Sequence, residues 1–142
     1  MILIDTNIVS EAFKKLPDRN VERWFLAQPE AELFICTPVL AELHYGVNLL
    51  PDGKKKRELA RVTEELELEF FAHRVLPIDA VAARHFGEIR ALRYKAGRSV
   101  APMDILIAAI ARANSMTLAT RNLYHFEDLG ITLINPFEAT AQ

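Results

Sequence analysis

The most constraining feature of this sequence is a series of short apolar runs, separated by segments that carry helical periodicity. The runs lie at residues 1–4, 33–36, 75–78, 117–119 and 132–134. A short apolar run of this kind is typical of a strand that is buried on both faces. Strands that alternate with helices predict a three-layer α/β fold, in which a mostly parallel five-stranded sheet is flanked by helices.

The segments between the runs carry helix start and stop signals. We expect helices over residues 8–15, 37–50, 54–71, 80–96, 102–114 and 123–128, and a short one around Val21, Trp24 and Phe25. Thr37 is the expected cap of its helix, and the helix over 102–114 should be the central buried one because it is apolar nearly all round. The helix over 54–71 should face inward with Leu59, Val62, Leu66 and Phe70. The helix over 80–96 should face inward with Ala82, Phe86, Ile89 and Leu92.

Length and composition limit the class of protein. A chain of 142 residues suits one domain, here residues 1–142. Its 17 basic and 19 acidic residues give a net charge of −2, so bulk charge does not indicate a polyanion-binding protein. The single cysteine, Cys36, excludes an intrachain disulfide and a cysteine-based zinc cluster. No glycine pair matches a dinucleotide fingerprint or a Walker loop.

The sequence indicates a cytoplasmic protein without a membrane segment. A spanning helix needs roughly 20 consecutive apolar residues, and the longest apolar run covers only residues 105–111. The apolar N-terminal run stops at Asp5 and has no basic leader before it, which is unlike a signal peptide.

Three acidic residues are expected to meet at one edge of the sheet. Asp5 follows the first strand, Glu42 lies in the first turns of the helix after the second strand, and Asp104 begins the helix before the fourth. Ligands of open parallel sheets bind at the carboxyl ends of the strands. Taken singly, Asp5 and Asp104 could be helix-start carboxylates and Glu42 a solvated charge. Together they predict a site for Mg²⁺ or Mn²⁺, which suits hydrolysis of phosphate esters.

Four segments, in this order and spacing, resemble the successive motifs of PIN-domain ribonucleases, above all the VapC toxins of type II toxin–antitoxin systems. They are Asp5–Ser10, Ala41–Gly46, Pro102–Asp104 and Leu118–Asn122, and the resemblance extends from residue 1 to about residue 136. It implies an endoribonuclease that uses Mg²⁺ or Mn²⁺ to cleave RNA, often tRNA or rRNA. It also implies a homodimer that a cognate VapB-like antitoxin inhibits in a heterotetramer or larger complex.

The resemblance implies a role for each matching residue. Asp5, Glu42 and Asp104 become the catalytic and metal-binding carboxylates, and the polar residues around the metal become Thr6, Asn7, Thr120 and Asn122. Many relatives carry a fourth acid after the fourth strand, where Asn122 and His125 stand here. Asn122 could hold a metal-bound water through its amide oxygen. This difference leaves open whether one or two metal ions bind.

Three further residues are candidates for substrate binding: Arg98, Arg121 and His125. Arg98 belongs to a basic cluster with Arg90, Arg93 and Lys95, which either meets RNA phosphates or forms a solvated helix face. His125 either contacts phosphate, donates a proton or has a structural role.

Two other functions compete with the nuclease hypothesis. An aspartyl-phosphate phosphatase needs a second aspartate two residues after the first, where Asn7 stands, and a receiver domain needs an acidic pair and a lysine that are absent here. The other is a catalytically idle PIN-fold interaction module, which the missing fourth acid keeps open. Metal-dependent RNA cleavage separates these alternatives.

Overall fold

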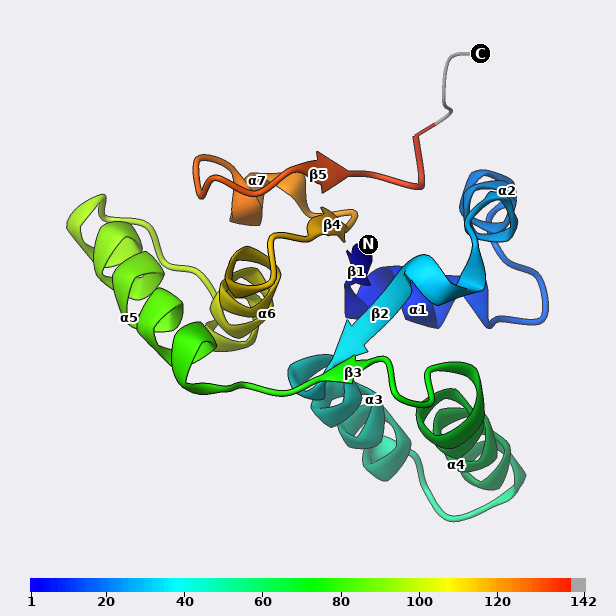
Figure 1. Cartoon of the computed structure of the whole chain (residues 1–142). Coiled ribbons are helices and arrows are strands. Elements are labelled where there is room, and N and C mark those ends of the chain that lie inside the picture. Colours follow the sequence, from blue (N-terminus) through cyan, green and yellow to red (C-terminus); the bar gives the residue numbers. More distant parts are fainter. Residues whose placement is uncertain (139–142) are drawn as a thin grey trace.

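The computed structural model describes residues 1–138, so the last four residues of the predicted domain lie outside the described part. One five-stranded sheet runs through the molecule in the order β3-β2-β1-β4-β5, and every neighbouring pair is parallel (Figure 1). Its strands are β1 (Ile2–Ile4), β2 (Leu33–Cys36), β3 (Val75–Leu76), β4 (Thr117–Ala119) and β5 (Leu133–Ile134). The predicted fold is confirmed, and the sheet is parallel throughout.

Helices flank both faces of this sheet. In Figure 1, α5 and α6 lie side by side on one side of the strands, and α1 and α2 lie on the other. The helices are α1 (Thr6–Ala12), α2 (Arg19–Ala27), α3 (Thr37–Leu49), α4 (Lys54–Glu65), α5 (Ala80–Lys95), α6 (Pro102–Ala113) and α7 (Leu123–Phe126). Within residues 1–138, none of them has the length and apolar character that a membrane crossing requires.

Several helix boundaries differ from the prediction, for local reasons. α1 begins at Thr6 rather than at residue 8, because the Asp5 carboxylate accepts the first free N–H group of the helix. Thr37 is the first residue of α3 and not its cap, since the cap position is Cys36 and no side chain bonds the helix there. The helix predicted over 54–71 gives way at Leu66 to one wide π-type turn, Leu66–Phe70.

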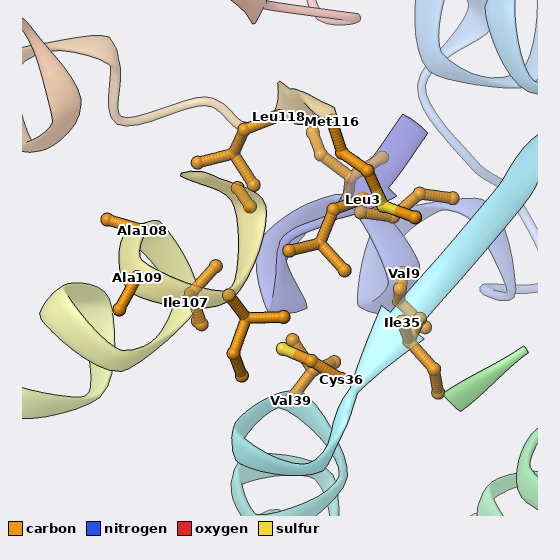
Figure 2. Packing of buried hydrophobic residues seen from close by; sticks show 14 of the residues in the cluster. Leu3, Val9, Ile35, Cys36, Val39, Ile107, Ala108, Ala109, Met116 and Leu118 are labelled. Carbon is orange, nitrogen blue, oxygen red and sulfur yellow. The ribbon is translucent and has the colours of Figure 1, made fainter. Parts of the chain in front are cut away.

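The core lies between the sheet and its helices, with α6 at its centre as predicted. Figure 2 shows side chains from β1, β2, α3, α6 and β4 meeting there, among them Leu3, Ile35, Val39, Ile107 and Leu118. The buried residues of α6 are Ile105, Ile107, Ala108, Ala109, Ile110 and Ala111. This packing fixes the start of α6, and with it Asp104, against the sheet.

Two predicted inward positions are wrong. Leu92 on α5 is 53% exposed, and its neighbour Arg93 is only 6% exposed. Arg93 turns inward because its guanidinium donates to the backbone carbonyl of Glu127, just after α7. Leu59 is 39% exposed, because α4 stands beside α3 and away from the sheet (Figure 1).

Candidate active site

Asp5 lies at the carboxyl end of the central strand β1. Its backbone N–H donates to the carbonyl of Ala119 at 2.9 Å, so the pairing of β1 with β4 continues to this residue. Its carboxylate accepts hydrogen bonds from the Thr6 backbone N–H at 2.7 Å, the Thr120 hydroxyl at 2.7 Å and the Asn7 amide at 3.3 Å. Three donors therefore fix the carboxylate in one orientation.

Burial makes the negative charge of Asp5 unfavourable. The residue is only 4% exposed, and this desolvation raises the pKa of its carboxyl from 3.8 to about 6. The bonds from Thr120 and Thr6 lower this pKa, while the charges of Asp104 and Glu42 raise it further. A group in this state favours a neutralising partner, which is either a proton or a cation.

Glu42 reaches the same region from the second turn of α3. The Thr6 hydroxyl donates to its carboxylate oxygen Oε1 at 2.7 Å. Because Thr6 directly follows Asp5, this bond holds Glu42 beside the end of β1. The structure thus joins two acidic residues that lie 37 positions apart in the sequence through one threonine.

Asp104 lies in the first turn of α6 and is paired with His125 from α7. The distance from His125 Nδ1 to Asp104 Oδ2 is 2.7 Å, and the two side chains are 41% and 17% exposed respectively. His125 therefore contacts a carboxylate in this structure. No local pattern in the sequence connects these residues, because the contact depends on where α7 docks on α6.

The polar residues predicted around the acids divide into two groups. Thr6, Asn7 and Thr120 bond the acidic side chains directly, as described above. Asn122 is exposed and donates only its backbone N–H, to the Thr120 hydroxyl at 3.1 Å, so its side chain has no protein partner among residues 1–138.

The two predicted substrate-binding arginines have different neighbours in the structure. The backbone N–H of Arg121 donates to the Asn7 side chain at 3.3 Å, and its guanidinium lies 4.4 Å from the centre of the Phe137 ring. Arg98 lies 4.4 Å from the centre of the Tyr124 ring, one residue before His125. Arg121 thus contacts a residue that bonds Asp5, while Arg98 contacts the residue before His125.

The site supplies oxygen ligands of the type that Mg²⁺ and Mn²⁺ prefer. Within residues 1–138, however, no three histidine, cysteine or acidic side chains form an arrangement that could hold a metal ion. Glu42 and Asp104 are engaged by Thr6 and His125 instead. The donor chemistry fits a hard cation, the three ligands are not preassembled, and metal binding stays a prediction.

Cysteine chemistry does not compete at this site. Cys36 is fully buried at the end of β2, and burial raises the pKa of its thiol to about 12. A thiol of this kind does not ionise near neutral pH and is neither a nucleophile nor a metal ligand.

Comparison with known proteins identifies the family of this chain. A sequence-family model described as the PIN domain matches residues 2–130. The plasmid stability protein StbB of Pseudomonas syringae pv. tomato is 41% identical over 98% of this chain and 100% of its own length. The VapC ribonuclease Y4jK of Sinorhizobium fredii is 37% identical over 97% of this chain and 99% of its own.

A further relative has a solved structure. The toxin FitB of Neisseria gonorrhoeae is 36% identical over 96% of this chain and 99% of its own length. A structure of FitAB bound to a DNA fragment contains a chain that superposes with a TM-score of 0.90, at 35% identity and 99% coverage of both chains. The relatives therefore match the whole domain and not a single motif.

Proposed function

This chain belongs to the PIN-domain family, and from that membership we propose that it is a metal-dependent endoribonuclease, the toxin of a toxin–antitoxin pair. The observation that supports the proposal is the buried carboxylate of Asp5 at the carboxyl end of β1, whose pKa is raised by the charges of both Asp104 and Glu42. The names of the relatives, a VapC ribonuclease and a toxin, support the substrate and the role.

In the proposed mechanism, the carboxylates of Asp5, Glu42 and Asp104 would hold Mg²⁺ or Mn²⁺. Such an ion, when bound, supplies positive charge to the phosphate and makes a bound water more acidic. Thr120, Asn7 and the Thr6 backbone hold Asp5 in place, and the Thr6 hydroxyl positions Glu42. In this route a water molecule attacks the phosphorus in line, the 3′-oxygen leaves and the ribose 2′-hydroxyl is not the nucleophile, so we expect hydrolysis to leave 5′-phosphate ends. Cut ends with a 2′,3′-cyclic phosphate would contradict this route.

We further propose that a cognate VapB-like antitoxin inhibits the protein in the cytoplasm, and that the toxin acts as a dimer within a larger complex. The FitAB structure supports a partner of this type, because its matching chain covers this chain almost completely. The test is purification of the protein together with the product of the adjacent gene, followed by measurement of the mass of the complex.

The direct test is incubation of the purified protein with tRNA and rRNA, first with Mg²⁺ and then with EDTA. We expect cleavage only with the metal, and none by Asp5→Asn or Asp104→Asn. Glu64→Gln is the matched control, because this exposed acid on α4 is remote from the site and forms no ion pair or hydrogen bond among residues 1–138. Absence of metal-dependent cleavage, or equal cleavage by wild type and Asp5→Asn, would favour an idle interaction module.

A further inference from the structure

A small cavity lies between the end of α5 and the start of α6, and its lining includes Ile105, the residue after Asp104. It has a volume of about 120 Å³, which is room for several water molecules at about 30 Å³ each. Its lining includes Arg90, Arg93, Arg98, Ser99 and Pro102. Three arginine residues thus line one small cavity in a chain whose net charge is −2.

Arg93 is the unusual member of this group. It is only 6% exposed, and its Nε is a buried donor without a hydrogen-bond partner among residues 1–138. The only hydrogen bond that its guanidinium forms there goes to a neutral backbone carbonyl, that of Glu127. Buried arginines are normally paired, so an unpaired donor lining a cavity indicates a missing acceptor.

Arg98 is brought beside Arg93 by the turn that ends α5. Gly97 adopts a positive φ of 69°, and this turn lets the Arg98 backbone N–H donate to the Arg93 carbonyl at 2.9 Å. None of Arg90, Arg93 and Arg98 forms an ion pair within residues 1–138. The charges of Asp128 and Glu127 act on Arg93 without forming an ion pair, and the charge of Arg98 opposes that of Arg93. The positive charge at the cavity is therefore only partly compensated, which favours an anion.

The surroundings favour a nucleic-acid phosphate over a carboxylate. Tyr124 is 66% exposed and Tyr94 is 85% exposed, so both rings are open beside the arginines. Bases of single-stranded RNA stack on tyrosine rings and on guanidinium planes, and Arg98 already stacks on Tyr124. The 12-residue helix α6 also starts at this cavity without a side-chain cap, which adds free N–H groups.

The cavity and the acidic site share helix α6, and the Arg98 guanidinium links the cavity to α7 by donating to the Tyr124 carbonyl at 2.6 Å. Pro102 and Ile105 line the cavity, and Asp104 lies between them on α6. Tyr124 precedes His125, whose ring nitrogen lies 2.7 Å from Asp104. We propose that this cavity binds a phosphate of single-stranded RNA that flanks the one being cut, with the flanking base stacked on Tyr124. The inference rests on the proposed function, because it assigns part of its substrate.

The test measures binding without cleavage. A fluorescently labelled single-stranded RNA is titrated with the Asp5→Asn protein in EDTA, at several salt concentrations, and anisotropy is recorded. Arg98→Gln and Arg90→Gln are introduced separately; both side chains are at least partly exposed, which lessens the risk of unfolding. Arg84→Gln is the matched control, since it removes an exposed arginine from α5 that does not line the cavity.

We expect Arg98→Gln to weaken RNA binding about tenfold, as for loss of a charge-assisted hydrogen bond. The slope of log affinity against log salt should fall by about 0.7 for each RNA phosphate that the variant no longer neutralises. In the protein with Asp5 intact, the same variant should raise KM for RNA and leave kcat close to wild type. The control should change neither binding nor KM.

RNA affinity of Arg98→Gln equal to that of Arg84→Gln would overturn the inference. Unchanged RNA affinity together with weaker binding of a peptide rich in aspartate and glutamate would also overturn it, and would assign the cavity to an acidic protein segment. These outcomes are independent of the nuclease proposal, which fails only if metal-dependent cleavage is absent.

Discussion

Replacing Asp5 by asparagine should make the metal-free protein more stable at neutral pH. The pKa of this carboxyl is 3.8 as an isolated group and about 6 in the folded protein, a difference of about 2 units. Each unit corresponds to about 1.36 kcal/mol, so ionised Asp5 costs the fold about 3 kcal/mol. Asparagine keeps an acceptor for the Thr6 N–H and has no charge to desolvate.

The sign of the pH dependence follows from the raised pKa. Between pH 3.8 and about 6, the folded state binds the Asp5 proton and the unfolded state has released it. The stability that this proton contributes is complete below pH 3.8 and is lost as the pH rises through about 6. The difference in unfolding free energy, Asp5→Asn minus wild type, should therefore grow by up to about 3 kcal/mol between pH 4 and pH 7.5.

Urea unfolding in EDTA at a series of pH values measures this difference. Other titrating groups are present in both proteins and largely cancel in the subtraction. The Glu64→Gln variant provides the control, and its difference from wild type should stay within about 0.5 kcal/mol at every pH, as for most surface changes. A flat difference for Asp5→Asn across this range would refute the argument that burial controls the carboxyl.

Three further predictions follow from the same interactions. Mg²⁺ at a hundred times its Kd should stabilise the wild type by about 2.7 kcal/mol, as measured by urea unfolding, and should not stabilise Asp5→Asn; an equal gain in both would place the metal elsewhere. Thr6→Val removes the 2.7 Å bond to Glu42, so it should lower the unfolding free energy by about 1 kcal/mol and reduce RNA cleavage. The control is Thr117→Val, because the Thr117 hydroxyl makes no hydrogen bond within residues 1–138, and this variant should retain full cleavage. Ile107→Ala at the fully buried centre of α6 should lower the unfolding free energy by about 2–5 kcal/mol, and a decrease below 1 kcal/mol would contradict the placement of α6 in the core.

The order of strands and helices was predictable because apolar runs reveal which segments are buried on both faces. Apart from helix boundaries and the cap at Thr37, the predictions that failed concern which side of a helix faces inward. Leu92 and Arg93 are adjacent on α5, and the helical pattern of apolar residues alone predicts that Leu92 is the buried one. The carbonyl of Glu127, 34 residues away, reverses that choice by accepting a hydrogen bond from Arg93. Such a hydrogen bond exists only once the chain after α7 has docked.

Part of the candidate site was predictable from the positions of the strand ends, whereas the side-chain bonds between helices were not. The rule that parallel strands end at one edge places Asp5 and Thr120 together, and the hydroxyl of Thr120 does bond the Asp5 carboxylate at 2.7 Å. The bonds of Glu42 to Thr6 and of Asp104 to His125 were not predictable. They depend on side-chain rotamers on helices whose relative positions are set by the core, and no spacing in the sequence encodes them.

The charge of Asp5 requires an explanation that a helix cap does not provide. As the N-cap of α1, Asp5 accepts a hydrogen bond from the Thr6 N–H, and serine or asparagine can also cap a helix in this way. The fold instead keeps a carboxylate that is nearly fully buried, in the field of two other acids. A residue that lowers stability and is replaceable in its local role fits a functional requirement, because stability is commonly given up where activity needs a strained or charged group. A hard cation bound by all three acids would compensate the buried charge of Asp5 and the smaller repulsion from Asp104 and Glu42, so the instability of the metal-free site and its proposed chemistry have the same electrostatic origin.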